Sequence, residues 1–360
     1  MTSELQDRRR RLAEELRLKK LDGFIVSAGP NVRYLAGFTG SNAALLLMAG
    51  GEAVLFTDPR YQFQAARETG CKVRVARGPL LPRLMALARR KSLRRLGFEK
   101  GRLTYEEYEL LSEGLWLGAS LKPVAGLVET QRMVKSAREI ALIRRSAVTL
   151  CATFERVIGR ASPGIREKDL AAEFDYQMRR LGADQPAFET IVTSGERTAL
   201  PHARPTANRL AANQLVLVDM GASQDGYASD MTRMAFLGSP SRRLKQLYAA
   251  VLEAQLAALD AVRPGISAGA VDRAARNALR ARKLDRAFLH STGHGLGLEV
   301  HEPPRLGKRE KTRLAAGMVI TIEPGAYLEG FGGVRIEDTV VVTPGGCDIL
   351  TSTPKELLLL

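Results

Sequence analysis

The sequence contains little cysteine, histidine or tryptophan. Its 360 residues include three cysteines, four histidines and one tryptophan. The cysteines, Cys71, Cys151 and Cys347, lie far apart and match no CxxC spacing, which argues against a disulfide framework and against a thiolate zinc site. We therefore expect isolated, reduced thiols and a chemistry carried by other residue types.

Long apolar runs are also absent. A helix needs about 20 largely apolar residues to cross a bilayer, and the longest runs here, such as residues 43–49, have the length of a strand. The basic residues 8–11 stand among acidic residues, and no apolar stretch follows them as it would in a secretory signal. These absences predict a cytoplasmic protein without a membrane partner.

The charges are not balanced, because 54 Lys and Arg residues exceed 39 Asp and Glu residues and leave a net charge of +15. A nucleic-acid site needs a basic cluster or a recognisable binding module. Here the basic residues are spread along the chain between acidic ones. We expect a solvated, Arg-rich surface and no nucleic-acid partner, with nucleic-acid binding as the alternative.

The first third of the chain alternates between helical and strand patterns. An amphipathic segment at residues 4–20 is followed by short apolar runs at 24–27, 43–48, 53–57 and 73–75. Gly50-Gly51 is typical of a hairpin turn. Long helical periodicity begins near Thr130, with Ser136 as its expected N-cap. The pattern predicts a small α/β domain at residues 1–128 and a second domain at residues 129–360.

The second domain repeats its pattern of elements. Pro-Gly-Ile occurs at residues 163–165 and again at 264–266, 101 positions later. Each copy follows a long helical pattern and precedes a second helix, a phenylalanine (Phe188 or Phe288) and glycine-rich strands. Two copies of helix, helix and β-hairpin predict an α+β domain with a pseudo-two-fold repeat and a site at the junction. A chance match of three residues is the alternative.

Four carboxylates follow or interrupt the strand patterns of this repeat. Asp219 ends the apolar run 215–218, and the return strand predicted at 227–236 carries Asp230. The runs 318–322 and 332–336 lead into Glu323 and Glu337. Carboxylates that converge in a pocket of low dielectric repel one another, so protons or cations must compensate them. Divalent metal ions do this well.

All four histidines lie in the second domain. They are His202, His290, His294 and His301, and the last three occupy one glycine-rich stretch. A single histidine in isolation is more often structural than a ligand. Their concentration beside paired carboxylates favours a role in metal binding or catalysis.

Five segments of the second domain resemble the motifs of one metallopeptidase family, which includes aminopeptidase P, prolidase, methionine aminopeptidase and creatinase. They are residues 216–221 (VLVDMG), 229–233 (SDMTR), 293–297 (GHGLG), 321–325 (TIEPG) and 335–338 (RIED). The resemblance covers residues 130–355 with the motifs in the right order. It implies a creatinase-like, "pita-bread" catalytic domain behind the smaller α/β domain.

The resemblance also implies a ligand set for two divalent metal ions: Asp219, Asp230, His294, Glu323 and Glu337. In the family the two aspartates and the residue matching Glu337 bridge or chelate the metals, and the residues matching His294 and Glu323 complete the second site. Four carboxylates and one imidazole suit Mn best, with Co or Zn able to substitute. Bound metals would supply an activated water and polarise the scissile carbonyl.

The remaining roles are carried over by position. His202 and His301 resemble the outer histidines that stabilise the tetrahedral intermediate, and Glu323 is suited to pass a proton to the leaving nitrogen. His290 resembles a pocket residue of the family near the leaving proline, with a structural role as the alternative. Tyr327 and Arg335 are candidates to orient the ligating carboxylates, and we assign all three to the substrate-binding pocket. We therefore assign His202, His301 and Glu323 to catalysis.

The first domain points to proline-containing peptides as substrates. Residues 31–41 and 57–61 resemble the N-terminal domain of Xaa-Pro peptidases and creatinase, which methionine aminopeptidases usually lack. Residues 188–195 and 201–202 resemble the proline-specific branch. Proline needs dedicated enzymes, because the scissile nitrogen is tertiary and fixes the backbone shape.

Within this branch we favour an aminopeptidase P-like Xaa-Pro aminopeptidase. The alternative, an Xaa-Pro dipeptidase or prolidase, must bind the carboxylate of proline with a cationic group, and Arg335 is the one ambiguous candidate for that role. Creatinase activity is a further alternative. A non-catalytic binding module is another, although the presence of all five ligands argues against it. We also expect a homodimer.

Overall fold

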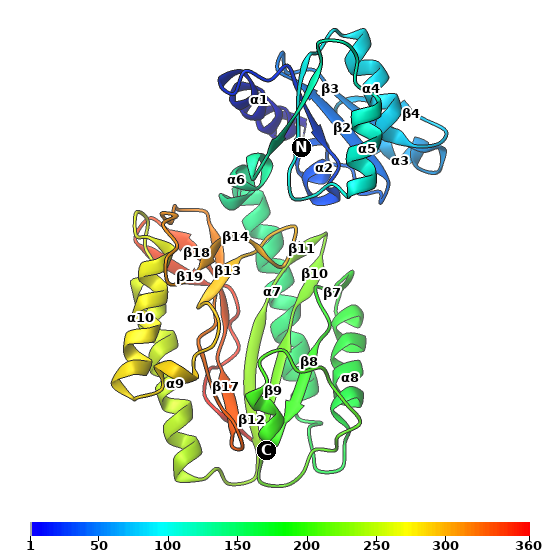
Figure 1. Cartoon of the computed structure of the whole chain (residues 1–360). Coiled ribbons are helices and arrows are strands. Elements are labelled where there is room, and N and C mark those ends of the chain that lie inside the picture. Colours follow the sequence, from blue (N-terminus) through cyan, green and yellow to red (C-terminus); the bar gives the residue numbers. More distant parts are fainter. Residues whose placement is uncertain (1) are drawn as a thin grey trace. The chain divides into compact units, whose positions relative to one another are not determined.

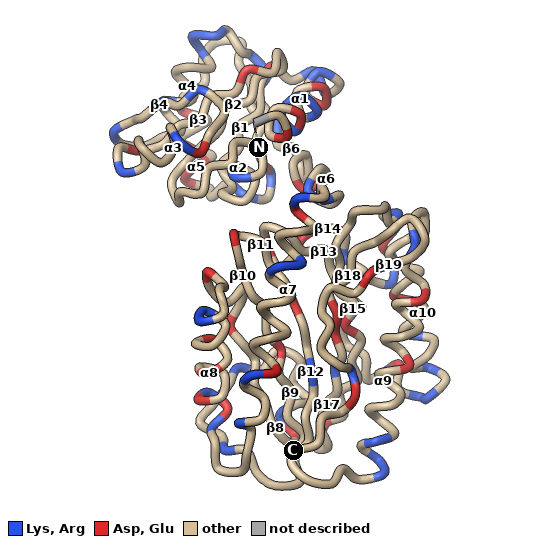
Figure 2. Tube along the Cα trace, turned by 180° about the vertical axis from the view of Figure 1, so that it is seen from behind, with Lys and Arg blue, Asp and Glu red and all other residues tan. Residues whose placement is uncertain are grey.

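The structure is a computed structural model that describes residues 2–360 (Figure 1). It divides into two compact units, Met1–Arg132 and Met133–Leu360. The boundary expected near residue 128 falls within helix α6 (Leu127–Met133). Between residues 2 and 360, no helix combines the length and apolar character that a membrane span requires. Lys and Arg positions are scattered over both units together with Asp and Glu positions (Figure 2).

The N-terminal unit is a six-stranded mixed sheet with helices. Its strands in spatial order are β4 (Lys72–Val75), β3 (Ala53–Thr57), β2 (Ala43–Met48), β1 (Gly23–Val26), β5 (Arg95–Glu99) and β6 (Ser120–Val124). Its other elements are α1 (Thr2–Leu18), α2 (Gly29–Ala36), η1 (Pro59–Tyr61), α3 (Gln62–Glu68), α4 (Leu80–Arg90) and α5 (Tyr105–Glu113). The central strands read as apolar runs because both of their faces are buried. The predicted small α/β domain is confirmed.

The antiparallel pair β2 and β3 turns at the two glycines that the sequence singled out. Gly51 has a φ of +93°, which L side chains rarely adopt, and its N–H donates to the carbonyl of Met48 (2.8 Å). The turn therefore requires glycine for a conformational reason.

The C-terminal unit, Met133–Leu360, contains four long helices: α7 (Ala137–Ile158), α8 (Glu167–Arg180), α9 (Arg242–Ala261) and α10 (Ala268–Ala281). Helix α7 begins with a capping box, in which Glu139 N donates to Ser136 Oγ (3.2 Å) and Ser136 N to the Glu139 carboxylate (2.9 Å). Helix α8 and the pair α9 and α10 lie on opposite sides of the unit in Figure 1. Each helix buries an apolar face on the strands, in two separate core clusters.

The strands of this unit form two main sheets and two small ones. One main sheet has the order β20 (Leu358–Leu359), β12 (Met231–Leu237), β9 (Gln214–Met220), β8 (Ile191–Ser194). The other has the order β14 (Glu302–Leu306), β13 (Gly293–Gly295), β15 (Val319–Ile322), β18 (Asp338–Thr343), β19 (Gly346–Ile349). The small sheets are β11 (Tyr227–Ala228), β10 (Ala222–Gln224), β7 (Gln185–Pro186), and the pair β16 (Gly325–Leu328), β17 (Gly332–Arg335). Short 3₁₀ segments are η2 (Gly195–Ala199) and η3 (Asp285–Ala287).

The Pro-Gly-Ile repeat marks equivalent turns in the two halves of this unit. Gly164 and Gly265 have φ values of +97° and +84°. The Gly164 carbonyl accepts from Arg209 Nη1 (2.5 Å), and the Gly265 carbonyl accepts from Arg313 Nη1 (2.6 Å). In both turns, an arginine side chain donates to the carbonyl of the positive-φ glycine. The predicted pseudo-two-fold repeat is confirmed.

Candidate metal centre

In the first half, the two aspartates lie where one strand ladder gives way to another. Asp219 lies at the end of β9, opposite Thr232 of β12, while the hairpin tip is formed by β10 with β11. The prediction of one return strand at 227–236 is wrong, because Ser229 and Asp230 interrupt it. The chain changes pairing partner at this point. Asp230 therefore lies between β11 and β12, outside a regular strand in which side chains point alternately to the two faces of a sheet.

The second half has the same construction. Strand β15 pairs with β18, with Ile322 opposite Asp338, while β16 and β17 form the hairpin tip. Glu323 follows Ile322 directly, and Glu337 precedes Asp338 directly. The expected strand leading into Glu337 therefore ends at Arg335, and β18 begins after Glu337. Both glutamates lie at the change of partner.

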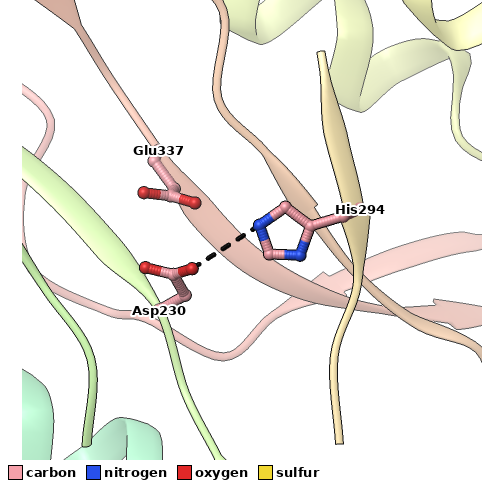
Figure 3. Close-up of side chains that lie close together, drawn as sticks. All are labelled: Asp230, His294 and Glu337. Atoms are coloured by element: carbon pink, nitrogen blue, oxygen red, sulfur yellow. Dashed lines mark ion pairs between the residues drawn. The ribbon is translucent and has the colours of Figure 1, made fainter. Parts of the chain in front are cut away.

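Asp230, His294 and Glu337 point toward one another from these junctions and from β13 (Figure 3). Each offers one ligand atom, and these atoms lie within 4.8 Å of one another. His294 Nε2 lies 3.6 Å from Asp230 Oδ2 and 3.4 Å from Glu323 Oε1. The arrangement forms a candidate metal site with oxygen and nitrogen donors.

The orientation of His294 is fixed by its own strand. Its Nδ1 donates to the carbonyl of Gly295 (3.0 Å), which leaves the Nε2 lone pair directed at the carboxylates. The flanking glycines have a packing reason, since a Cβ at Gly293 would overlap the Thr321 carbonyl and a Cβ at Gly295 the Pro303 carbonyl. The GHG segment therefore lets β13 approach its neighbours closely enough to bring the imidazole to the carboxylates.

The carboxylates are too crowded to be ionised together without a cation. Burial raises the pKa of Asp230 well above its ordinary value, and repulsion from Glu337 and Asp219 adds to this. Burial also raises the pKa of Glu337, with repulsion from Glu323 and Asp219, and raises the pKa of Glu323 to about 7, partly offset by Arg335. Within residues 2–360, the Oδ1 atoms of Asp219 and Asp230 are buried and lack a hydrogen-bond partner. These residues fit divalent metal ions, which would satisfy both the orphaned oxygens and the repulsion.

Arg335 is the cation built into the site. It is buried, and each of its three nitrogens donates to a protein group: Nη2 to Asp219 Oδ2 (2.6 Å), Nε to Thr232 Oγ1 (3.0 Å), and Nη1 to both the Tyr327 hydroxyl (2.9 Å) and the Pro201 carbonyl (3.1 Å). Thr232 in turn donates to Glu337 Oε2 (2.7 Å). Arg335 therefore orients ligands and the loop before His202 rather than standing free in the cavity.

A cavity of about 670 Å³ opens over this cluster. Nine of the ten residues assigned from the sequence line it: His202, Asp219, Asp230, His290, His294, His301, Glu323, Arg335 and Glu337. The tenth, Tyr327, contacts two of them, because its hydroxyl bonds to His290 Nε2 (2.8 Å) and to Arg335. Burial raises the pKa of Tyr327 to about 12. The structure thus brings all ten residues to one place.

The outer histidines differ in their surroundings. The rings of His294 and His301 meet edge to face, with centroids 4.4 Å apart. His290 packs between Phe288 and Tyr327, and burial, with a smaller effect of Arg335, lowers the pKa of His290 to about 4. His290 is therefore a neutral imidazole near pH 7, whereas His202 is exposed at the cavity wall.

Arg305 also lines the cavity, although no pattern in the sequence singled it out. Arg305 is opposite His294 in the ladder between β13 and β14, so the two side chains leave the same face of the sheet. Its guanidinium is exposed and has no ion pair or hydrogen bond to any residue in the described range 2–360. The segment HEPPR at 301–305 was visible in the sequence, but only strand pairing shows that its arginine faces the site.

Two family models match the chain. The model for metallopeptidase family M24 matches residues 141–344, and the model for the creatinase/prolidase N-terminal domain matches residues 8–134. The Xaa-Pro dipeptidase of Pyrococcus furiosus is 35% identical over 354 residues, which cover 98% of this chain and 100% of that protein.

Two solved structures are similar over nearly the whole chain. The Xaa-Pro dipeptidase from Bacillus anthracis has a TM-score of 0.95 and 36% identity and covers 100% of both chains. The X-Pro aminopeptidase from Thermotoga maritima MSB8 has a TM-score of 0.89 and 33% identity and covers 96% of this chain and 100% of its own. The resemblance stated from five segments is confirmed, as is the pita-bread fold. The chain belongs to metallopeptidase family M24 and is a hydrolase with a creatinase/prolidase N-terminal domain.

Proposed function

We propose that the chain is an Xaa-Pro dipeptidase that holds two divalent metal ions with Asp219, Asp230, His294, Glu323 and Glu337. The orphaned buried oxygens of the two aspartates and the raised pKa values of Asp230, Glu323 and Glu337 support this ligand set. The oxygen-rich donors favour Mn, with Co or Zn able to substitute. When bound, the metals would activate water and polarise the scissile carbonyl.

The preference for an aminopeptidase, drawn from the sequence, is not supported as well as its alternative. The relatives from Pyrococcus furiosus and Bacillus anthracis are Xaa-Pro dipeptidases, although the Thermotoga maritima neighbour is an X-Pro aminopeptidase. The preference rested on the lack of a free cation for the proline carboxylate, with Arg335 as the one candidate. Arg335 is engaged with Asp219, but Arg305 supplies the missing charge.

The single observation that carries the dipeptidase proposal is the position of Arg305. A dipeptide that ends in proline presents its carboxylate next to the scissile bond. Arg305 and the ligand His294 leave one face of the sheet into the same cavity, so a guanidinium stands beside the metal site without a protein partner among the described residues. Guanidinium and carboxylate form paired, charge-assisted hydrogen bonds. The site thus suits a substrate with a free carboxylate.

The other cavity residues have roles that follow from their contacts. His202 and His301 stand at the wall as donors to the oxyanion that develops at the scissile carbonyl. Glu323, beside His294, carries the proton to the proline nitrogen. His290, held neutral by burial and bonded to Tyr327, offers an uncharged surface to the proline ring.

The test compares two substrates on the Mn-loaded protein. We expect Gly-Pro to be cleaved with a higher kcat/KM than Gly-Pro-Ala. Arg305→Leu should raise the KM for Gly-Pro about 10- to 100-fold, the scale of a hydrogen bond to a charged group, and should leave Gly-Pro-Ala nearly unchanged. Arg309→Leu removes an exposed arginine outside the cavity and serves as the control. Preferred cleavage of Gly-Pro-Ala by the unaltered protein would return the assignment to the aminopeptidase.

A further inference from the structure

Arg233, on β12, has the largest fully buried side chain among the described residues and is 2% exposed. Its neighbour Thr232 faces the carboxylates of the site, so Arg233 leaves the opposite face of the strand. Arg233 Nε donates to the Pro354 carbonyl (3.0 Å), and Nη2 donates to the Thr353 carbonyl (2.6 Å). Nη1 donates to the backbone carbonyl of Glu337. Arg233 therefore ties the strand after Asp230 to the backbone of Glu337 and to the C-terminal residues.

Asp338, which follows Glu337 directly, is the acidic partner of Arg233. Its carboxylate is fully buried and accepts from Arg233 Nη2 (2.7 Å), Gln255 Nε2 (2.7 Å), Thr351 Oγ1 (2.9 Å) and Lys355 Nζ. Four donors therefore hold this carboxylate, and two of them come from residues 351–355. A buried carboxylate that accepts from four donors is held in one geometry.

The same C-terminal residues reach the backbone of Asp230. Thr339 N donates to Thr351 Oγ1 (3.2 Å). The Thr339 hydroxyl accepts from Asp230 N (3.2 Å) and donates to the Asp230 carbonyl (2.8 Å). Residues 351–355 therefore hold two residues that border proposed metal ligands. Asp338 follows Glu337 in the chain, and Thr339 bonds to the backbone of Asp230.

Residues 351–355 and the strand that follows them are held in place by α9 and by β12. The Tyr248 hydroxyl on α9 bonds to the Lys355 carbonyl, and β20 pairs in parallel with β12, with Leu358 opposite Ala235. Strands β12 and β18 belong to different sheets, so in the described part of the chain no ladder fixes their separation. The connection is made by the Arg233 network together with the bonds of Thr339 to Asp230 and the bond from Glu337 N to the Thr232 carbonyl (3.3 Å).

We propose that Arg233 and Asp338, held by residues 351–355, are positioning residues that fix the separation of Asp230 from Glu337 and thereby set the metal affinity of the site. The inference rests on the ligand set of the proposed function. Neither side chain touches the cavity, so the network acts through the backbone of the ligands. Partners of metal ligands are known to tune affinity in this indirect way.

The experiment compares Asp338→Asn with Glu167→Gln. Glu167, on α8, is equally buried and also pairs with an arginine, Arg197 (3.3 Å), but its partners lie outside the ligand set. Mn²⁺ affinity is measured calorimetrically on metal-free protein, with the absorption spectrum of the Co²⁺ form and the thermal midpoint recorded for each variant. We expect Asp338→Asn to weaken Mn²⁺ binding about 10- to 100-fold and to shift the Co²⁺ bands. Glu167→Gln should lower the midpoint and leave affinity and spectrum unchanged.

Lys355→Met provides a milder variant. Lys355 is partly exposed, and its substitution removes one of the four donors to Asp338. It should weaken Mn²⁺ binding about tenfold or less and keeps the test decisive if Asp338→Asn does not fold. Unchanged affinity and spectrum in the folded variants, or an equal loss in Glu167→Gln, would overturn the inference. Failure of the unaltered protein to cleave Gly-Pro with Mn²⁺ bound would overturn only the dipeptidase assignment. A lack of any divalent metal binding would remove both.

Discussion

The two halves of the catalytic unit are built alike and contribute different side chains. In each half a long ladder, β9 with β12 or β15 with β18, gives way to a hairpin tip, β10 with β11 or β16 with β17. The first half places two aspartates at this change of partner, and the second half places two glutamates there. The repeat therefore explains why four carboxylates meet, because equivalent junctions of two related halves face one centre.

The halves differ in what holds each carboxylate. Arg335 of the second half donates to Asp219 of the first (2.6 Å), while Thr232 of the first half donates to Glu337 of the second (2.7 Å). Each half thus orients a ligand of the other.

The imidazoles are distributed unequally. The second half supplies His290, His294 and His301, and the first half supplies His202. His294 places its Nε2 within 4 Å of two of the carboxylates, those of Asp230 and Glu323. The first half therefore contributes mainly oxygen ligands, and the second contributes both ligands and the neutral groups around the substrate.

The strongest way to break the comparison is to remove a ligand from one half. We expect Asp230→Asn to lower kcat by more than the roughly 100-fold typical for loss of a ligand's partner, and to lower metal stoichiometry. The N-terminal unit should stay folded, because it forms a separate compact unit. Asp348→Asn alters an exposed carboxylate of the second half and should change neither quantity. Full activity of metal-depleted Asp230→Asn protein would contradict the proposed ligand set.

Removal of the one imidazole from the first half tests a smaller effect. His202→Ala should keep the metal and lose about 100-fold in turnover, the scale for one donor to a developing oxyanion. Turnover and bound metal are measured on the same preparation. Unchanged turnover would take His202 out of catalysis, and loss of metal would make it a ligand instead.

His290, in the second half, predicts a pH effect on stability. Its pKa in the folded protein is about 4, below the ordinary 6.5, because burial disfavours the charged ring. The unfolded chain then binds the extra proton between pH 6.5 and 4, so this contribution to stability is present above pH 6.5 and is lost as the pH falls toward 4.

The measurement is the difference in thermal midpoint between the unaltered protein and His290→Gln, both free of metal, at pH 7.5 and pH 5. We expect His290→Gln to be less stable at pH 7.5, because it loses ring packing with Phe288 and Tyr327. At pH 5 the gap should narrow by a few degrees, on the scale of about 2–4 °C per kcal/mol for a unit of this size. A gap that stays constant with pH would show that His290 does not titrate abnormally.

The smallest expected effect tests whether the two Pro-Gly-Ile turns are equivalent. Gly164 and Gly265 share a positive φ, and a Cβ at either position would meet nothing within 4 Å. Gly164→Ala and Gly265→Ala should therefore each lower the free energy of unfolding by about 1 kcal/mol, from backbone strain alone. Equal losses with unchanged kinetics support the equivalence of the two turns. A large loss at one position and none at the other would contradict it.

Local signals in the sequence accounted for most of the fold. The capping box at Ser136, the turn at Gly51 and the two Pro-Gly-Ile turns depend on neighbouring residues, and each formed where the pattern placed it. The interruption at Asp230 was missed, because no glycine or proline within residues 227–236 marks a break. The break arises from pairing with two different partners, and partners distant in sequence leave no local signal.

By itself, the sequence determined the family and the group of residues that meets in the cavity, because these follow from residue identity at fixed motif positions. Only the tertiary structure decided how those residues are used. It engages Arg335 with Asp219, brings Arg305 to the face that carries His294, and places Arg233 between the backbone of Glu337 and the C-terminal residues. The physical reason is that a charged side chain acts on whatever lies within a few ångströms, and at these positions its partners are distant in sequence.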